Sequence, residues 1–176
     1  MMYRGTICLI LGVLLTVVAC DGGAKQSASK VANASIDGAK YLLASEPATA
    51  LNVIAARKSA KHDESISLVG RIGGSTDPWI NGLAAFTIVD TSLKACSDIP
   101  GDTCSKPWDY CCETKESLSD ATVLVKFVDD QGRVLNVGAR DLLRLAELNT
   151  VVVTGKAQRD DAGNLTVLAS GLFVRK

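Results

Sequence analysis

The sequence predicts a mainly β protein, a small five-stranded Greek-key barrel with one helix that plugs an end of the barrel. Three observations lead to this prediction. Five segments with the alternating apolar pattern of strands follow residue 65, and a short amphipathic segment falls between the third and the fourth of them. Hydrophobic residues make up 47% of the chain but aromatic residues only 5%, so aliphatic side chains must supply most of the core. This composition favours a compact β-rich fold over disorder.

The N-terminal residues have the pattern of an export signal. Arg4 supplies a positive charge, and residues 7–18 form an apolar run that is too short to span a bilayer. Ala19 and Cys20 end this run, an ending that resembles the lipobox of bacterial lipoproteins. The resemblance implies removal of residues 1–19 and acylation of Cys20. The acyl chains would anchor the protein to a membrane, facing the extracytoplasmic, periplasmic side of the cell envelope. The alternative is an ordinary secretory signal that contains a cysteine by chance.

Two segments precede the predicted barrel. Residues 20–46 are expected to form a flexible tether behind the lipidated cysteine, because small and polar residues prevail in its first part. A helical lead-in is predicted over 47–64, since a capping residue and a proline precede apolar residues at helical spacing. Leu51, Val53 and Ala55 also alternate as in a strand, which leaves a strand as the alternative.

The barrel domain is predicted over 65–176. Its first strand contains Gly70, where a barrel strand can bend sharply. The five strands indicated by period-two alternation and by turn residues are 66–72, 84–89, 122–128, 150–157 and 165–174. The plugging helix is predicted over 141–148, where leucines recur with amphipathic spacing. Residues 133–137 could return as a hairpin partner of the third strand.

The order strand, strand, strand, helix, strand, strand is that of the OB-fold. Three segments strengthen the comparison: Ser67–Ile72 resembles the first strand of that fold, Phe86–Asp90 the second and Val151–Ala157 the fourth. The resemblance covers about residues 66–174 and implies a Greek-key barrel. An unrelated small β-barrel or sandwich is the alternative. The sequence departs from the OB-fold pattern at residues 91–120, an insert between the second and third strands.

The insert holds the cysteines that can carry chemistry. Of six cysteines in the chain, one lies in the signal and one at the anchor, and four lie in the insert: Cys96, Cys104, Cys111 and Cys112. An even number of clustered cysteines in an exported protein predicts structural disulfides. A bridge between adjacent residues is geometrically awkward, so Cys96 and Cys104 would each pair with one of Cys111 and Cys112.

A metal-binding or redox site is the alternative for the same four cysteines. Thiolates favour copper(I), zinc and iron–sulfur clusters. The spacing of seven, six and no residues between successive cysteines matches no paired zinc-knuckle pattern, so copper or another thiophilic metal is favoured over zinc. The Cys-x-x-Cys step of a thiol oxidoreductase is also missing. If the disulfides form, no metal or other cofactor is expected.

Aromatic and acidic residues flank the last two cysteines. Trp108, Asp109, Tyr110 and Glu113 form a possible binding surface for an envelope protein or a glycan. The other interpretation is that Trp108 and Tyr110 pack the insert against the barrel. The segment Pro107–Glu113 resembles a signature of bacterial lipoproteins, and this resemblance implies no activity.

Together these features predict a membrane-tethered binding or accessory module whose disulfide-stapled insert contacts another envelope component. An oligonucleotide-binding OB-fold is a second alternative, with Arg71, Phe86, Lys126 and Phe127 as candidate contacts. Nineteen basic residues balance nineteen acidic ones, and acidic turns follow the third and fourth strands, so nucleic acid is not an expected partner. We expect no enzymatic activity, because the single histidine, His62, cannot complete a catalytic set.

Overall fold

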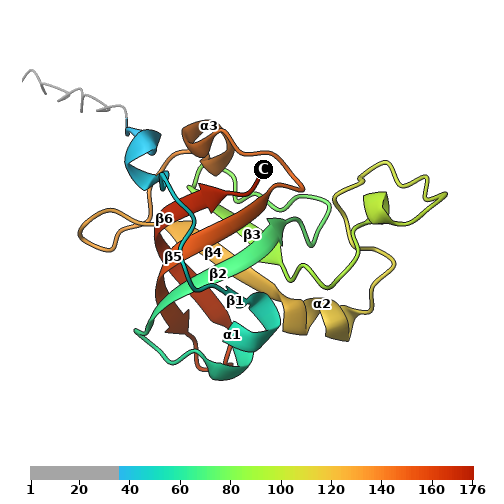
Figure 1. Cartoon of the computed structure of the whole chain (residues 1–176), viewed down its shortest axis with the longest axis horizontal. Coiled ribbons are helices and arrows are strands. Elements are labelled where there is room, and N and C mark those ends of the chain that lie inside the picture. Colours follow the sequence, from blue (N-terminus) through green and yellow to red (C-terminus); the bar gives the residue numbers. More distant parts are fainter. Residues whose placement is uncertain (1–35) are drawn as a thin grey trace, which may run out of the picture. The chain divides into compact units, whose positions relative to one another are not determined.

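The computed structural model describes residues 36–176, and their strands close into a barrel (Figure 1). The strands form one sheet in the order β1-β2-β3-β4-β6-β5, and a further pairing of β2 with β5 closes it. The predicted signal over 1–19, the lipidation at Cys20 and the first part of the tether lie outside the described residues.

The elements are η1 Gly38–Tyr41, β1 Leu51–Asn52, α1 Val53–Ser59, β2 Ser65–Ile72, β3 Ala85–Val89, η2 Cys96–Asp98, α2 Lys115–Ala121, β4 Thr122–Phe127, α3 Ala139–Leu143, β5 Thr150–Arg159 and β6 Leu165–Val174. The lead-in helix, the five barrel strands and the helix between the third and fourth of these strands follow one another in the predicted order, whereas η1, β1, η2 and α2 were not predicted. In the barrel β4 and β6 run parallel, and the pairs β2–β3, β3–β4, β5–β6 and β2–β5 are antiparallel. The predicted fold class, a small OB-fold-like barrel with an insert between its second and third strands, is confirmed.

Alternation along the strands builds the core. In β4 the inward side chains Val123, Val125 and Phe127 are buried, whereas the residues between them are half-buried. Phe86 on β3 stacks on Phe127, with ring centroids 6.1 Å apart. Most other core side chains are Val, Ile, Leu or Ala, as the composition requires. The rings of Phe86 and Phe127 therefore lie among aliphatic side chains in the barrel interior.

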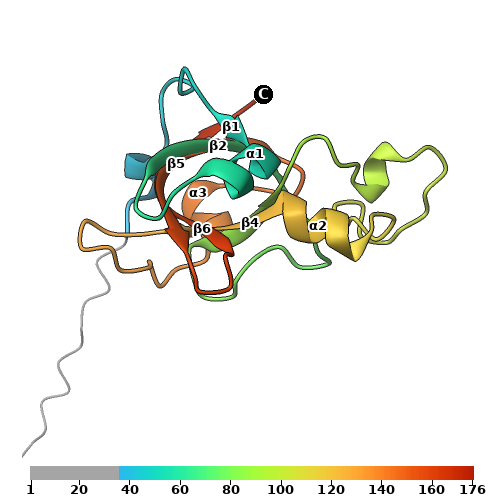
Figure 2. The same cartoon turned by 90° about the horizontal axis from the view of Figure 1, so that it is seen from below.

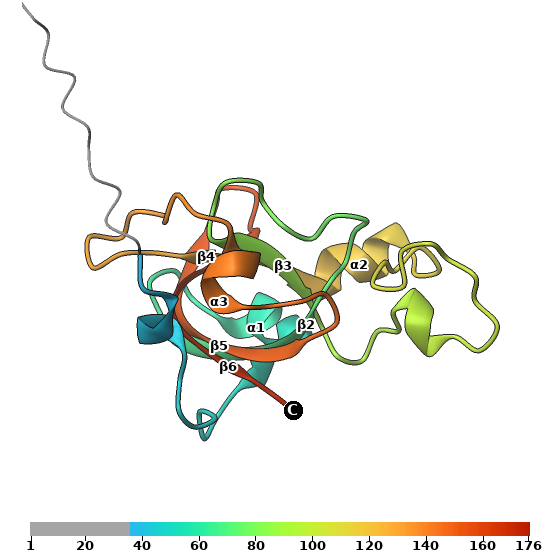
Figure 3. The same ribbon diagram turned by 90° about the horizontal axis from the view of Figure 1, so that it is seen from above.

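Short helices cover the two ends of the barrel. Val53 and Ala56 of α1 enter the core from one end (Figure 2), and Ala139 and Leu143 of α3 enter it from the other (Figure 3). Because each helix contributes only a few apolar side chains, one or two turns suffice to close each end. None of the helices among residues 36–176 combines the length and the apolar character that crossing a bilayer requires.

Both predicted helices are shorter in the structure than the sequence suggests. The lead-in helix predicted over 47–64 is wrong outside α1, because β1 precedes it and the Asn52 side chain caps its first turn by accepting from the Ala55 N–H (2.8 Å). The predicted helix 141–148 instead begins at Ala139 and ends at Leu143. Arg144 adopts a left-handed conformation (φ 53°), and this terminates the helix.

Residues 38–46 pack on the barrel, so the flexible tether predicted over 20–46 is wrong for this part. Tyr41 is only 3% exposed; its ring meets Phe127 edge-on at 5.5 Å, and its hydroxyl donates to the Val128 carbonyl (3.2 Å). The Leu43 N–H donates to the Leu172 carbonyl (2.7 Å). Buried Tyr41 and half-buried Leu43 supply the apolar surface that holds the segment in place.

Candidate functional site

The insert extends from the barrel between β3 and β4, on the side opposite η1 (Figures 1 and 3). Its two arms are joined by backbone hydrogen bonds. The Cys96 N–H donates to the Asp109 carbonyl (2.8 Å), and the Ser97 N–H donates to the Pro107 carbonyl (2.9 Å). These bonds place the first cysteine of the insert beside the segment that carries the last two.

An ion pair ties the insert to the barrel. The Arg71 guanidinium on β2 contacts both carboxylate oxygens of Asp98, with Nη2 3.1 Å from Oδ1. The hydrogen bond from Arg71 lowers the pKa of Asp98, and the backbone N–H of Ala95 contributes in the same direction. Because Asp98 ends η2, the helical turn that begins at Cys96, this pair fixes the turn against the barrel.

Apolar packing supplies a second tie. Tyr110 is fully buried with Val89, Ala95 and Ala121, which form a small core separate from that of the barrel. A Cβ on Gly73 would lie 2.9 Å from the Tyr110 ring and 2.8 Å from the Trp108 carbonyl, so this contact needs a glycine. Burial is the main cause that raises the pKa of Tyr110 to about 12.

Burial of Tyr110 corrects the predicted partner-binding surface. Tyr110 packs the insert against the barrel, and it cannot belong to an exposed surface. Trp108 is half-buried, and its indole N–H donates to the Thr76 carbonyl (3.1 Å). Asp109 and Glu113 accept from the backbone N–H groups of Tyr110 (2.8 Å) and Lys94 (3.2 Å). All four residues therefore hold the insert in shape, and three of them keep some exposed surface.

The sequence reasoning missed Asp90, the only buried polar residue among residues 36–176. It follows β3 directly and is 1% exposed. Its carboxylate accepts from the Ile54 N–H in the first turn of α1 (2.9 Å) and from the Ser92 N–H at the start of the insert (3.0 Å). The signal in the sequence is an aspartate between a buried strand and a turn, a position that many exposed aspartates share.

Three of the four insert thiols converge. The Sγ atoms of Cys96, Cys104 and Cys111 all lie within 4.8 Å of one another. Cys96 and Cys111 are close, with 3.3 Å between their sulfurs. Cys112 does not belong to this set of three: its thiol neighbours that of Cys111 and faces the Asp102 carboxylate at 3.9 Å. No disulfide joins any of the four cysteines, so the predicted bridges stay a prediction.

Two thiols of the cluster, those of Cys96 and Cys111, have raised pKa values. Burial raises the pKa of Cys96 to about 12, and the hydrogen bond with Cys111 acts in the same direction. Cys96 lowers the pKa of Cys111 through their hydrogen bond, but burial and the neighbouring thiols of Cys112 and Cys104 raise it overall. A soft metal ion that binds these cysteines would displace their thiol protons, because the thiolate and not the thiol is the metal ligand.

The thiol set fits a soft metal ion. Thiolates that bind one ion at about 2.3 Å lie no more than about 4.6 Å apart, so the three sulfurs are already near the required spacing. His62 is not part of this set; it is exposed, and its Nδ1 accepts from the Arg159 N–H (3.2 Å). Three thiols without a fourth protein ligand suit copper(I) better than a closed tetrahedral zinc site.

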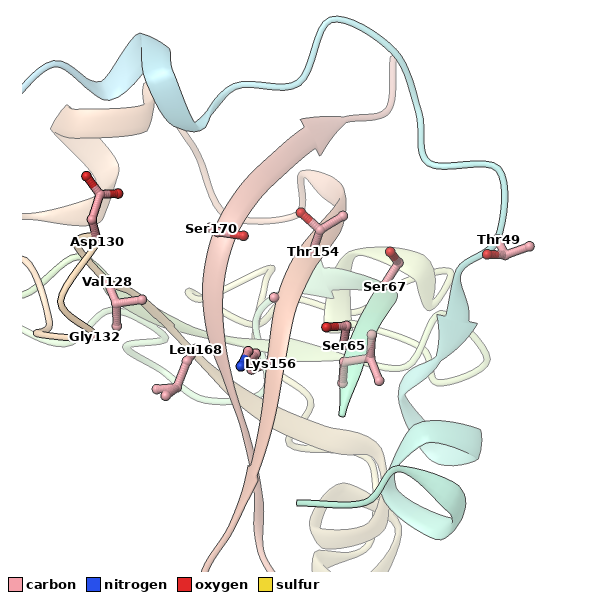
Figure 4. A pocket seen from close by; sticks show the side chains of 12 residues that line it. Thr49, Ser65, Ser67, Val128, Asp130, Gly132, Thr154, Lys156, Leu168 and Ser170 are labelled. Carbon is pink, nitrogen blue, oxygen red and sulfur yellow. The ribbon is translucent and has the colours of Figure 1, made fainter. Parts of the chain in front are cut away.

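A groove of about 660 Å³ crosses the outer face of β2, β5 and β6 (Figure 4). Its polar lining consists mainly of hydroxyls, including Ser65, Ser67, Thr154 and Ser170. One cation, Lys156, and one carboxylate lie among them, and none of the lining residues is aromatic or carries a thiol. Serine and threonine are ordinary at outward strand positions, so this groove could not be predicted from the sequence.

Most of the residues predicted as candidate contacts for an oligonucleotide have structural roles in the barrel or at the insert. Phe86 and Phe127 are fully buried in the barrel and cannot stack on bases. Arg71 is paired with Asp98. Lys126 alone of the four keeps a half-exposed side chain that is free of such a role.

Comparison with known proteins adds little to this geometry. No protein-family model matches the sequence, and no curated protein matches it significantly. Among solved structures, the chain is similar to the hypothetical protein ygiW from E. coli, with 14% identity and a TM-score of 0.36. The match covers 72% of this chain and 90% of the other. A similarity at this level carries no information about function.

Proposed function

We propose that the protein is a membrane-tethered, extracytoplasmic OB-fold accessory protein whose insert binds a soft metal ion, copper(I) above all. The observation that carries this proposal is the convergence of the Cys96, Cys104 and Cys111 sulfurs within 4.8 Å. Two ties to the barrel, the Arg71–Asp98 pair and buried Tyr110, hold the cluster in place. A preorganised set of ligands binds with a smaller entropic cost than a flexible loop.

The tether supports an extracytoplasmic role for the insert. A linker from Cys20 to Ile36 could span up to roughly 50–60 Å. The described part of the chain begins just ahead of η1, which lies on the barrel side opposite the insert (Figure 1). A linker of this length would leave the insert free to reach partners beyond the membrane surface. Replacement of Cys20 by serine should abolish acylation and leave the leader uncut, so that only the apolar run of the leader holds the variant at the membrane. A variant that stays membrane-bound with its leader removed would contradict the lipid anchor.

A second candidate function is favoured by the 3.3 Å separation of the Cys96 and Cys111 sulfurs. In this alternative, disulfides brace the insert, and the exposed parts of Trp108, Asp109 and Glu113 contact an envelope protein or a glycan. Free-thiol counting on protein purified without reductant separates the two functions. Disulfide-braced protein has no reactive insert thiols and holds no stoichiometric metal.

The metal function is tested by anaerobic titration of the reduced full-length chain with copper(I) against a chromogenic copper(I) chelator. We expect one ion per chain. Replacement of Cys96, Cys104 or Cys111 by serine should each weaken copper(I) binding by more than about tenfold. Mutation of residues that only support a metal ligand can already reduce metal affinity by this factor. Cys112→Ser is the matched control, and it should bind copper(I) with unchanged affinity, because its thiol lies outside the cluster.

Two results would contradict the proposal. One is an affinity that falls equally in all four serine variants, because the cluster would then have no special role. The other is zinc retained in preference to copper(I) at equal concentrations, because a fourth ligand would then be needed.

A further inference from the structure

Two of the clustered thiols differ from the third in their mutual distance and in their exposure. The Cys96 and Cys111 sulfurs are 3.3 Å apart, in hydrogen-bond contact, while the Cys104 sulfur faces the Lys106 carbonyl at 3.5 Å. Cys96 is 1% exposed, whereas Cys111 is exposed to solvent. An exposed thiol next to a buried one is the arrangement in which a first thiol meets an external reactant and a second completes the reaction.

We infer that Cys96 and Cys111 form a redox pair, with Cys111 as the thiol that exchanges with an external disulfide. This inference goes beyond the proposed function, and only its consequence for metal binding rests on that function. The external disulfide belongs to a small molecule such as oxidised glutathione.

The reaction balances without any other oxidant. The Cys111 thiolate attacks one sulfur of the external disulfide; a mixed disulfide forms, and one external thiolate leaves. The Cys96 sulfur then attacks the Cys111 sulfur, and the second external thiolate leaves. The Cys96–Cys111 bond forms, the external disulfide is reduced to two thiols, and these take up the two protons that the cysteines lose.

The backbone already holds the pair in position. The bonds from Cys96 N–H to the Asp109 carbonyl and from Ser97 N–H to the Pro107 carbonyl fix the two arms side by side. A disulfide bond needs a sulfur separation of about 2.05 Å, which the two side chains can reach by rotation from contact distance. The competing bridge between Cys111 and Cys112 joins adjacent residues, whose backbone rarely allows the required torsions.

Oxidation would remove two of the three metal ligands. With Cys96 and Cys111 joined, only Cys104 of the cluster keeps a free thiol, and one thiolate cannot hold copper(I) against cellular thiols. Bound copper(I) would conversely occupy both sulfurs and block the exchange. The disulfide and the metal therefore exclude each other on this insert.

The test treats the reduced full-length chain with oxidised glutathione, blocks the remaining thiols and cleaves the chain before aspartate. Cleavage before Asp98, Asp102 and Asp109 leaves Cys96, Cys104 and the last two cysteines in separate fragments. The first cross-linked product should join the fragments 90–97 and 109–119, with the loss of two insert thiols. Cys111→Ser should slow this loss by more than about tenfold, and Cys112→Ser should leave it unchanged.

Preloading with copper(I) should also slow the loss of thiols by more than about tenfold. A first product that links 102–108 to 109–119, or a disulfide between two chains, would overturn the inference. Cross-linking at an unchanged rate with copper(I) bound would overturn the mutual exclusion. If the reduced protein forms the cross-link but binds no copper(I), the proposed function fails and the redox pair stands. If it binds copper(I) but forms no cross-link, the redox pair fails and the proposed function stands.

Discussion

At the scale of single residues, the insert depends on one glycine and one tyrosine at its junction with the barrel. Gly73 leaves room for the Trp108 backbone and the Tyr110 ring, and Tyr110 fills the small core beneath the thiols. Tyr110 directly precedes Cys111 in the chain. Their effect on the site is therefore one of position, through the segment that carries Cys111 and Cys112.

Gly73→Ala should destabilise the fold by about 1–3 kcal/mol, the usual cost of overpacking. The added methyl group would lie within 3 Å of the Trp108 carbonyl and the Tyr110 ring, and one of them must move. Urea unfolding measured by tryptophan fluorescence checks this. Gly138→Ala is the matched control, since a Cβ there meets nothing closer than 3.8 Å. Equal losses in the two variants would show that the contact at Gly73 is not tight.

Two replacements of Tyr110 separate its ring from its hydroxyl. The hydroxyl is buried and has no hydrogen-bond partner among the described residues, so Tyr110→Phe should leave stability unchanged or raise it by up to about 1 kcal/mol. Tyr110→Ala removes the ring and should cost about 3–5 kcal/mol. Chemical denaturation of both variants measures the difference. A large loss in Tyr110→Phe would reveal a partner for the hydroxyl, such as a buried water molecule.

At the scale of elements, the Arg71–Asp98 pair joins β2 to the turn η2, which begins with a clustered cysteine. Both side chains are partly exposed, so the energy of the pair is reduced by solvent screening. Its value to the site lies in geometry, because a two-point contact of guanidinium and carboxylate fixes orientation as well as distance.

This pair should make stability depend on pH. The pKa of Asp98 is lowered in the folded protein, so the pair stabilises the fold above the ordinary aspartate pKa of about 3.9 and loses this effect as the pH falls through the folded-state pKa. The difference in melting temperature between the natural protein and Arg71→Met should be largest near pH 7 and shrink below about pH 4. Circular dichroism melts over this range provide the measurement.

Arg133→Met is the control for this pH series. Arg133 pairs with Asp129 in an exposed turn, but backbone hydrogen bonds from Arg133 are the first cause of the lowered Asp129 pKa, and the replacement keeps that N–H. The melting temperature of this variant should follow that of the natural protein at every pH. A constant difference between Arg71→Met and the natural protein across the pH range would contradict a role for the Asp98 charge.

At the scale of the whole molecule, the N-terminal arm, residues 38–46, and the insert occupy opposite sides of one barrel (Figure 1). The arm is fixed by Tyr41, by the backbone bond to β6 and by the Glu46–Arg175 ion pair. Any tether attached ahead of residue 36 therefore joins the barrel at a defined place. The rigid arm would keep the insert at a set orientation relative to that attachment.

Tyr41→Ala should destabilise the whole barrel by about 3–5 kcal/mol, because it leaves a cavity beside Phe127 in the main core. Leu42→Ala is the neighbouring control. Leu42 is 43% exposed, and its replacement should cost no more than about 0.5 kcal/mol. Guanidinium unfolding followed by circular dichroism reports on the barrel strands. Similar unfolding midpoints for the two variants would show that the arm is not part of the cooperative unit.

The sequence by itself determined the strand pattern, the position of the helix between β4 and β5, and the insert. Period-two alternation is a local property, and Val, Ile and Leu at inward positions specify both the strand and the face it buries. Helix ends were less predictable, because Arg144 ends α3 in a left-handed conformation, which arginine rarely adopts. The cysteines were recognised as the site; the sequence predicted disulfides between them and left a metal site as the alternative.

Only the tertiary structure decided which thiols meet, which aromatic residues are exposed and where the arm lies. Each of these depends on contacts between residues far apart in the chain, such as Gly73 with Tyr110 and Tyr41 with Phe127. Sequence spacing cannot separate Cys111 from Cys112, since adjacent side chains point in different directions that only the fold defines. The folded insert does so: it turns Cys111 toward Cys96 and Cys112 toward Asp102.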